Sequence, residues 1–215
     1  MKQYKEHAVS PVVGVMLMLV VTIIIAAVVS GFAGGLMKGQ TKTPQATITG
    51  TFSVTQGMTI TNAGGDSLAT SNLLITTTNG PTFGPGLGST TVDPIPLNLT
   101  TNSAGTPIEF WNPTTQAYDG WNVTSFSPGD TWYINITNCN PQILTPNTAS
   151  FSSHGGYTFN GQEWTFLSSS GQPTINAFWQ LNFVNPANIG KQFYLDVYDK
   201  ASGAVISQSQ VTITG

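Results

Sequence analysis

The stretch that decides the fold is Pro11–Met37, PVVGVMLMLVVTIIIAAVVSGFAGGLM, which contains no charged residue. It is longer than the run of ~20 apolar residues that a helix needs to cross a bilayer. Ser10 and Pro11 form a helix start signal, because serine accepts from the first free amides and proline fits the first helical position. Gly34 and Gly35 mark the end. We expect one long hydrophobic helix at 8–38.

A short charged leader, MKQYKEH, occupies residues 1–7 in front of this helix. Three interpretations fit the pair of segments. A secretory signal peptide would be removed whole, although its apolar region normally has about 7–15 residues. A permanent transmembrane anchor would keep both segments. A prepilin-type signal would lose the leader and keep the helix.

Small residues recur at every fourth position near the end of the apolar run and form two adjacent ridges. The ridges are Ala26, Ser30 and Gly34, and Ala27, Gly31 and Gly35. Small side chains at this spacing let helices approach closely in an apolar medium. The pattern predicts that this helix packs against other helices.

The rest of the chain has few charged groups. Charged residues make up 7% of the sequence, against roughly 25% in ordinary soluble proteins. From residue 46 onward the chain contains two lysines and eight acidic residues, which gives a formal net charge of −6. Phosphate binding needs clustered Lys and Arg, so this composition excludes a nucleic-acid partner. Cys139 is the single cysteine, which excludes an internal disulfide and predicts a buried thiol.

Residues 39–45 are polar, contain Pro44 and predict a linker. Beyond the linker, apolar and polar residues alternate with the period of a half-buried strand, and turn signals separate the runs. Expected strands include 120–126, 131–137, 163–167, 175–184 and a closing hairpin at 193–198 and 204–213. The fold class is therefore α+β by content: a long N-terminal helix followed by an all-β, immunoglobulin-like β-sandwich at 46–215.

Three sequons, Asn98-Leu99-Thr100, Asn122-Val123-Thr124 and Asn135-Ile136-Thr137, are candidate N-glycosylation sites. Each asparagine has an apolar residue on either side. On a strand, successive side chains point to opposite faces. We therefore expect Asn98, Asn122 and Asn135 to face solvent.

Signals for catalysis are weak. No G-x-S-x-G motif is present, and the acidic residues are scattered singly. We expect no enzyme, no catalytic residue, no cofactor and no metal site. The five tryptophans are expected to pack in the core or at a subunit interface rather than to bind sugars. They are Trp111, Trp121, Trp132, Trp164 and Trp179.

The segment at 8–35, AVSPVVGVMLMLVVTIIIAAVVSGFAGG, resembles the N-terminal segment of euryarchaeal type IV pilins. Ser10 and Pro11, then Gly14, then an alanine-rich end occur in the same order as in that family. The resemblance implies a class III signal peptide, cut by a membrane-embedded prepilin peptidase at His7–Ala8 or at a bond beside it. It also places Gly14 among the helix-packing residues.

The resemblance implies a structural subunit of an archaeal type IV pilus, which polymerises through its helix into a surface filament that serves adhesion. The implied partners are further copies of the chain, the prepilin peptidase, an assembly ATPase and a membrane platform protein. The chain would sit in the cell membrane before assembly and in an extracellular filament after it. Two alternatives stay open: a single-pass, membrane-anchored surface binding protein that does not polymerise, and a minor pilin or archaellum-related subunit.

Overall fold

The computed structural model describes residues 11–37, 42–84, 94–139, 157–166 and 179–215. The chain divides into two compact units, Met1–Lys42 and Thr43–Gly215. The predicted leader at 1–7 and residues 39–41 of the predicted linker lie outside the described residues, so these boundaries stay predictions.

The first unit contains one helix, α1 (Pro11–Met37), which has no acidic residue in its first turn and no basic residue in its last. Its segment Pro11–Phe32 has a mean hydropathy of 3.2, and by length and composition it suffices to cross a membrane. The second unit is built from strands. The predicted fold class, one long N-terminal helix followed by an all-β domain, is confirmed.

The strands of the second unit are short and follow one another closely along the chain. Their bounds are β1 (Ala46–Ser53), β2 (Gly57–Gly65), β3 (Leu68–Ala69), β4 (Leu73–Asn79), β5 (Glu109–Asn112), β6 (Ala117–Trp121), β7 (Ser125–Phe126), β8 (Thr131–Asn135), β9 (Tyr157–Phe159), β10 (Trp164–Phe166), β11 (Gln192–Asp199) and β12 (Val205–Thr214). Single 3₁₀ turns include η1 (Thr70–Asn72), η2 (Pro81–Phe83), η4 (Ile136–Asn138) and η5 (Pro186–Asn188).

Six strands form the main sheet, in the order β4-β11-β12-β1-β2-β8. All neighbours are antiparallel except β1 and β12, which are parallel and pair only at Phe52 with Ile213 and at Ser53 with Thr214. At the other end of β1, the Ser207 hydroxyl lies between the strands: it accepts from the Ile48 amide at 3.0 Å and donates to the Ile48 carbonyl at 3.4 Å. The sheet therefore curls at this joint.

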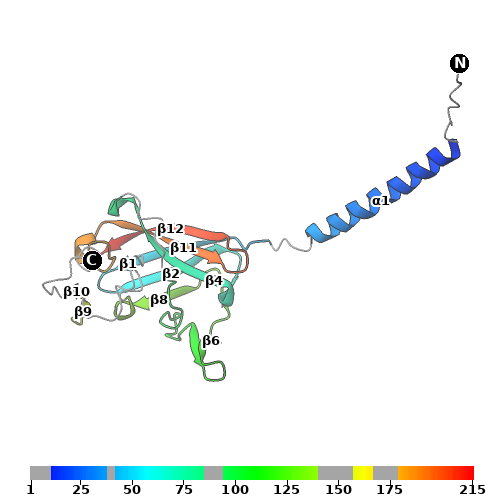
Figure 1. Ribbon diagram of the computed structural model, residues 1–215. Helices are drawn as coiled ribbons and strands as arrows, with labels where there is room; N and C mark the ends of the chain where they lie inside the picture. The colour runs from blue at the N-terminus through cyan, green and yellow to red at the C-terminus, as the bar shows by residue number, and fades with distance from the viewer. Residues whose placement is uncertain (1–10, 38–41, 85–93, 140–156, 167–178) are drawn as a thin grey trace, which may run out of the picture. The chain divides into compact units, whose positions relative to one another are not determined.

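The curl brings the half formed by β4, β11 and β12 against the half formed by β1, β2 and β8 (Figure 1). A Cβ atom placed on Gly50 of β1 would lie 2.9 Å from the Leu195 side chain and 3.0 Å from that of Val211. Glycine at this point lets the two halves approach closely. The domain is thus a two-layered β structure closed along one side.

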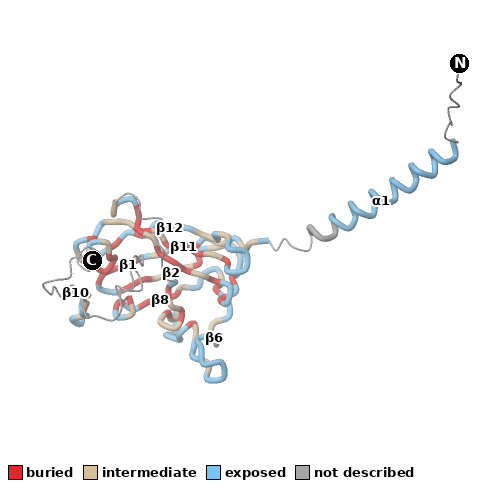
Figure 2. Tube along the Cα trace, viewed as in Figure 1, coloured by how far each residue is buried: buried red, intermediate tan, exposed pale blue. Residues whose placement is uncertain are grey.

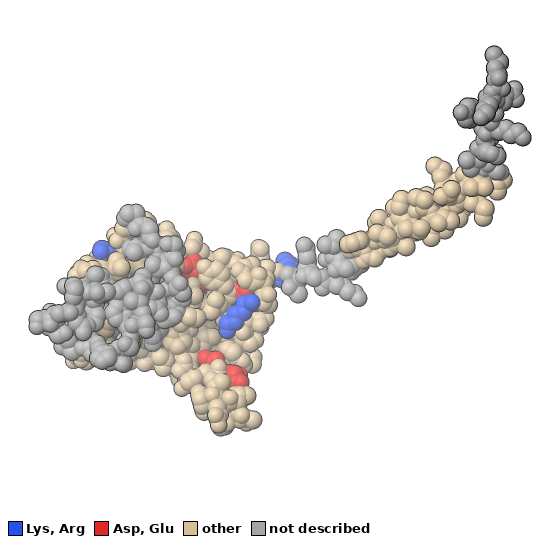
Figure 3. Space-filling model, in the orientation of Figure 1, with Lys and Arg blue, Asp and Glu red and all other residues tan. Residues whose placement is uncertain are grey.

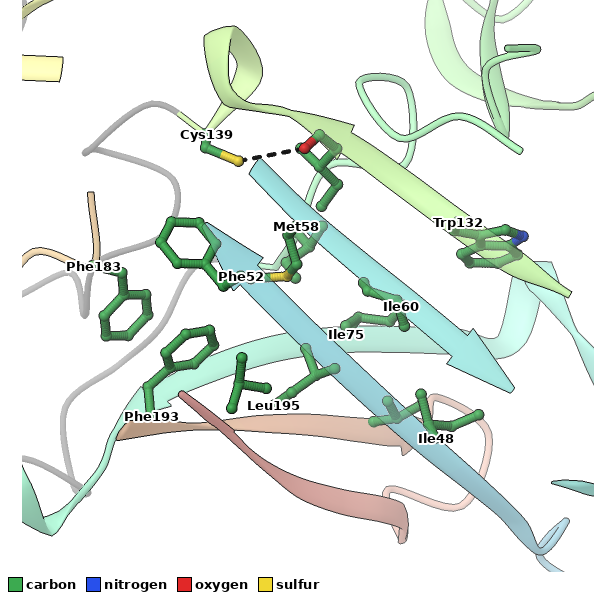
Figure 4. Close-up of a cluster of buried hydrophobic side chains, with 14 of the residues drawn as sticks. Ile48, Phe52, Met58, Ile60, Ile75, Trp132, Cys139, Phe183, Phe193 and Leu195 are labelled. Carbon is green, nitrogen blue, oxygen red and sulfur yellow. Dashed lines mark hydrogen bonds between the residues drawn. The ribbon is translucent and has the colours of Figure 1, made fainter. Parts of the chain in front are cut away.

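The core fills the space between the two halves and is rich in aromatic rings (Figure 4). Phe193 stacks on Phe183 with ring centroids 4.2 Å apart and meets the edge of Phe52 at 5.8 Å. Trp132 lies against Phe126 at 4.1 Å. Such contacts add to the gain from removing apolar surface from water, which is the main stabilising term of the fold.

The described part of the domain also contains three two-stranded pairs: β3 with β7, β5 with β6, and β9 with β10. The hairpin of β5 and β6 extends away from the main sheet, as Figures 1 and 2 show. Its residues are mostly exposed or half-buried, in contrast to the strands of the main sheet.

Two strand predictions need correction. Within the predicted strand 175–184, residues 179–184 instead form turns, because asparagine side chains bond to the backbone there: Asn185 Nδ2 donates to the Trp179 carbonyl at 2.8 Å. The predicted strand 120–126 is interrupted at residues 122–124, between β6 and β7. The closing hairpin is confirmed as β11 and β12, paired from Gln192 with Thr212 to Tyr198 with Val205.

Candidate functional site

Most of the exposed large apolar side chains among the described residues lie on α1. Every residue from Pro11 to Phe32 is exposed, as the continuous pale-blue helix in Figure 2 shows. The side chains are apolar all round, with no polar face. The hydroxyl of Thr22 donates to the Leu19 carbonyl at 2.9 Å, so this polar group is satisfied within the helix. A helix that is hydrophobic all round is stable only when apolar material surrounds it.

The structure places the predicted helix-packing residues on this surface. Residues four apart in a helix lie one turn apart on the same side, so Ala26 and Ser30 form one ridge, and Ala27 and Gly31 the next. All four are exposed. Gly34 and Gly35 continue both ridges within α1, although their surroundings lie outside the described residues.

Gly14 and Gly31 both face open space within the chain. A Cβ atom placed on either would meet nothing within 4 Å, so neither glycine is required by a contact inside this molecule. Glycine weakens a helix interior by about 1 kcal/mol relative to alanine. Close approach of a neighbouring helix is a reason to keep it, and this role stays a prediction. The predicted cleavage site, His7 and Ala8, lies outside the described residues.

The three sequons differ in structure. Asn98 is half-buried in a turn, and the hydroxyl of its sequon partner Thr100 is turned inward, where it donates to the Pro96 carbonyl at 2.9 Å. Asn122 is exposed between β6 and β7, but its Nδ2 donates to the Pro107 carbonyl at 3.0 Å. The hydroxyl at the first site and the asparagine amide at the second are therefore held by carbonyl groups outside the Asn–Thr pair.

Asn135 has the most accessible geometry of the three. It is exposed at the end of β8, where its Oδ1 accepts from the Thr137 amide and from the Thr137 hydroxyl, both at 3.1 Å. This arrangement holds the asparagine and the threonine of the sequon together at the surface and leaves the Asn135 amide nitrogen pointing away from those bonds. Occupancy by glycan stays a prediction at all three positions.

Two acidic residues, Asp196 and Asp199, form hydrogen bonds within the sheet and its closing turn. Asp196 is buried on β11, where its carboxylate accepts from Gln208 Nε2 at 2.7 Å and from the Thr78 hydroxyl at 3.0 Å. Asp199 accepts from the Ser202 hydroxyl at 2.6 Å and from the Ser202 amide at 3.0 Å, and these bonds lower the pKa of its carboxyl group. Among the described residues, no three His, Cys, Asp or Glu side chains lie together as metal ligands would.

Cys139 is fully buried, as predicted from its type, and its Sγ donates to the Ile134 carbonyl at 3.7 Å (Figure 4). Burial raises the pKa of this thiol to about 12, because the surroundings penalise the thiolate. A thiol with so high a pKa is a poor nucleophile and a poor metal ligand at neutral pH. Its role is to fill the core.

The tryptophans divide between the core and the surface. Trp132 is buried in the core, and Trp164 donates from Nε1 to the Ile136 carbonyl at 2.8 Å. Trp111 instead lies half exposed on the β5–β6 hairpin, next to Tyr118. Sequence alternation did not single out this aromatic pair. The signal that was available is the short sequence separation between two segments that contain aromatic residues, 110–111 and 118–121, with a polar segment between them.

Residues 7–48 match the family model for the N-terminal segment of archaeal type IV pilins. The match covers the whole of α1 and ends in β1, so it spans the exposed apolar surface described above. Searches of curated proteins and of solved structures returned no match to the chain. Residues 7–48 of the chain are thus similar to the N-terminal segment of archaeal type IV pilins.

Proposed function

We propose that this chain is a structural subunit of an archaeal type IV pilus, which polymerises through α1 into a surface filament for adhesion. The observation that carries the proposal is the surface of α1, a helix of 27 residues without a charge, in which every residue from Pro11 to Phe32 is exposed. The pilin match over the same residues supports it.

Two apolar environments suit this helix in turn. At ~1.5 Å rise per residue, α1 extends about 40 Å and therefore suffices to span the ~30 Å hydrocarbon core of a bilayer. On assembly, contacts with lipid are replaced by contacts with helices of neighbouring copies. Lipid tails are as apolar as leucine, so close packing at small residues, not the hydrophobic effect, favours the exchange. The ridges that begin at Ala26 and Ala27 supply such a surface.

The β domain forms the outer part of the filament in this proposal. Charged side chains are sparse on the face seen in Figure 3. The sequence of the domain is instead rich in Thr, Ser, Asn and Gln. We assign the domain no catalytic role. A prepilin peptidase removes the leader, and an assembly ATPase and a membrane platform protein drive the helix from the membrane into the filament.

The first experiment is N-terminal sequencing of the protein recovered from its native cells. The proposal expects a start at Ala8 or within one or two residues of it. A start at Met1 or Lys2 would show an uncleaved anchor and would overturn the proposal.

A pair of substitutions separates a filament subunit from a plain anchor. Gly31→Leu adds bulk to a small-residue ridge and should sharply reduce filament yield, while the protein still fractionates with membranes. Ile24→Leu keeps the volume at an equally exposed position and serves as the matched control. An unchanged filament yield in Gly31→Leu would contradict helix packing at the ridges. A helix surrounded only by lipid tolerates a large side chain at any position, whereas a closely packed helix does not.

A further inference from the structure

A groove of about 410 Å³ lies on the face formed by β1, β2 and β8. The exposed or half-buried side chains on its walls include Thr51, Thr59, Thr101, Tyr133, Asn135 and Thr214. The described residues that line the groove include no charged side chain. Hydroxyl and amide groups around one aromatic ring suit a neutral, polar ligand, and a sugar is such a ligand.

Tyr133 and Asn135 lie on the same face of β8. Side chains two residues apart on a strand point the same way and are about 7 Å apart. Tyr133 is 41% exposed, although its neighbours Trp132 and Ile134 are buried. A group attached to the Asn135 amide would therefore start beside an exposed aromatic ring.

The other two sequons lack such a ring in the same position. The residue two places before Asn98 is Pro96, and the residue two places before Asn122 is Gly120. Asn135 is thus the one sequon of the three that combines an exposed amide with an aromatic residue two positions earlier.

The space beside the Asn135 side chain is open. In the pairing of β8 with β2, Asn135 lies opposite Gly57, which has no side chain. Gly57 has a φ of +102°, and a Cβ atom there would clash with the Ile134 carbonyl oxygen, so only glycine fits this position. Asn135 Oδ1 is held by Thr137, whereas Asn135 Nδ2 has no hydrogen-bond partner among the described residues. The nitrogen that a glycan would occupy is therefore accessible at the wall of the groove.

The threonines of the groove have hydrogen-bonding capacity to spare. The hydroxyls of Thr51 and Thr59 bond to each other at 2.5 Å, which uses one of their two protons. The Thr214 hydroxyl donates to the Phe52 carbonyl at 2.8 Å, and its two lone pairs stay available. The groove thus offers a donor and several acceptors, and sugar hydroxyls need both.

We propose that Asn135 carries an N-linked glycan whose first sugar folds back into this groove and packs on the ring of Tyr133. The C–H groups on one face of a sugar cover the apolar body of the ring, while the sugar hydroxyls reach the threonines. The inference rests only on the part of the proposed function that places the β domain outside the cell, and it goes beyond that function by naming a modification and its docking site.

Attachment of the glycan requires a lipid-linked sugar phosphate as donor and a membrane enzyme that transfers the sugar. Asn135 Nδ2 forms a bond to the anomeric carbon of the first sugar and gives up one proton to a base. The bond between that carbon and the phosphate oxygen breaks, and the lipid phosphate leaves with its electron pair. The Thr137 hydroxyl, 3.1 Å from Asn135 Oδ1, completes the motif that such an enzyme recognises.

Peptide mass spectrometry of the full chain from native cells tests the attachment. The peptide that contains Asn135 should carry added sugar mass in the unaltered chain and in Thr137→Ser, which keeps the hydroxyl. Thr137→Ala should abolish the added mass, although the backbone amide of residue 137 can still bond to Asn135. An unmodified Asn135 in the unaltered chain would overturn the proposal.

Hydroxyl-radical labelling of the detergent-solubilised chain tests the docking. In the chain without glycan, Tyr133 and Tyr118 are 41% and 51% exposed. A docked sugar protects Tyr133, so its labelling rate should rise several-fold in Thr137→Ala. Tyr118 lies outside the groove lining and should be labelled equally in both proteins, which makes it the internal control. Equal labelling of Tyr133 with and without the glycan would overturn the docking.

Thermal unfolding supplies a second readout of the docking. Tyr133→Ser should lower Tm by about 2–4 °C in the glycosylated chain and change it little when combined with Thr137→Ala, because the ring then has no sugar to support. Tyr118→Ser is the matched control and should have the same effect in both backgrounds. If Tyr133→Ser also had the same effect in both, the ring and the glycan would not interact.

The outcomes keep this inference apart from the proposed function. Protection of Tyr133 only in filaments, and equally in filaments of Thr137→Ala, would assign the groove to a contact between copies and overturn the docking. A bare Asn135 in chains that start at Ala8 would overturn the glycan and leave the pilus subunit standing. A glycan on Asn135 in chains that start at Met1 would support this inference and overturn the pilus subunit.

Discussion

Ile24 and Ile60 have the same side chain and opposite surroundings. Ile24 in α1 is 55% exposed, whereas Ile60 in β2 is 0% exposed. The β domain buries its apolar residues against one another between the two halves of a curled sheet. The helix has no such interior, so its apolar surface must be covered from outside the described chain. The β domain covers its apolar core within a single copy, whereas the apolar surface of the helix needs cover from elsewhere, which the proposed function supplies as lipid and then as further copies.

The largest expected effect tests whether the core of the β domain stabilises the domain within a single copy. Phe193→Ala removes a ring that contacts both Phe183 and Phe52, and it leaves a cavity in the core. We expect the free energy of unfolding to fall by about 3–5 kcal/mol. Denaturant unfolding of the detergent-solubilised full chain, followed by tryptophan fluorescence, measures it. Ile189→Ala, at an exposed position, should change it little, and a similar loss in both variants would contradict the assigned core.

The next effect tests the dependence of the helix on apolar surroundings. Val21→Lys places a charge in the middle of α1, which costs about 2.5–3.5 kcal/mol in membrane insertion. We expect the protein to leave the membrane fraction and filaments to be absent, while the β domain folds normally. Val205→Lys is the matched control, because Val205 is an exposed valine of the β domain. If the Val21→Lys protein stayed in the membrane fraction and formed filaments, the helix would not depend on apolar surroundings, and its contrast with the β domain would be wrong.

A smaller effect concerns acid stability of the β domain. The bonds from Ser202 lower the pKa of Asp199, so the folded state favours its carboxylate. The stabilisation is present above the ordinary Asp pKa of ~3.9 and is lost as the pH falls through the lower folded-state pKa. Asp199→Asn should therefore lower stability at pH 7 and flatten its decline in acid. Parallel pH curves for both proteins, measured by thermal unfolding, would refute this.

The smallest effect is an expected lack of reaction. Cys139 is buried and the pKa of its thiol is about 12, so a maleimide at neutral pH should leave the folded protein unlabelled and label it after denaturation. Ser103→Cys, an exposed turn position, should react at once in the folded state. Rapid labelling of Cys139 in the folded protein would show that the domain opens more readily than its packing indicates.

Sequence patterns predicted best where one physical requirement dominates. The uncharged run predicted the helix correctly, because a backbone in an apolar medium must form its hydrogen bonds internally. Alternation of apolar and polar residues predicted β11 and β12 correctly. Sequence patterns predicted the wrong structure where side chains, rather than a neighbouring strand, form the hydrogen bonds of the backbone. Phe183 and Val184 are both buried although they are adjacent, because Asn185 and Asn188 bond to the backbone of a turn rather than of a strand.

The candidate site was predicted in part for a related reason. The ridges and the sequons are local patterns, so their positions follow from spacing alone. The pairing of Trp111 with Tyr118, and the groove on β1, β2 and β8, depend on which strands become neighbours. Alternation indicates which face a residue occupies, and it carries no information about the partner on that face.

The single internal bond of Thr22 has a consequence for how copies align. With that hydroxyl directed to Leu19, the middle of α1 shows a neighbour no charge at any height along its axis. Buried polar groups are what fix the register between packed helices in other assemblies. Two α1 helices that slide past each other by one turn exchange one set of apolar contacts for another. In the proposed filament, the vertical position of each subunit would therefore be set outside the helix, by the β domains, and the helical core could lengthen under tension without breaking a polar contact.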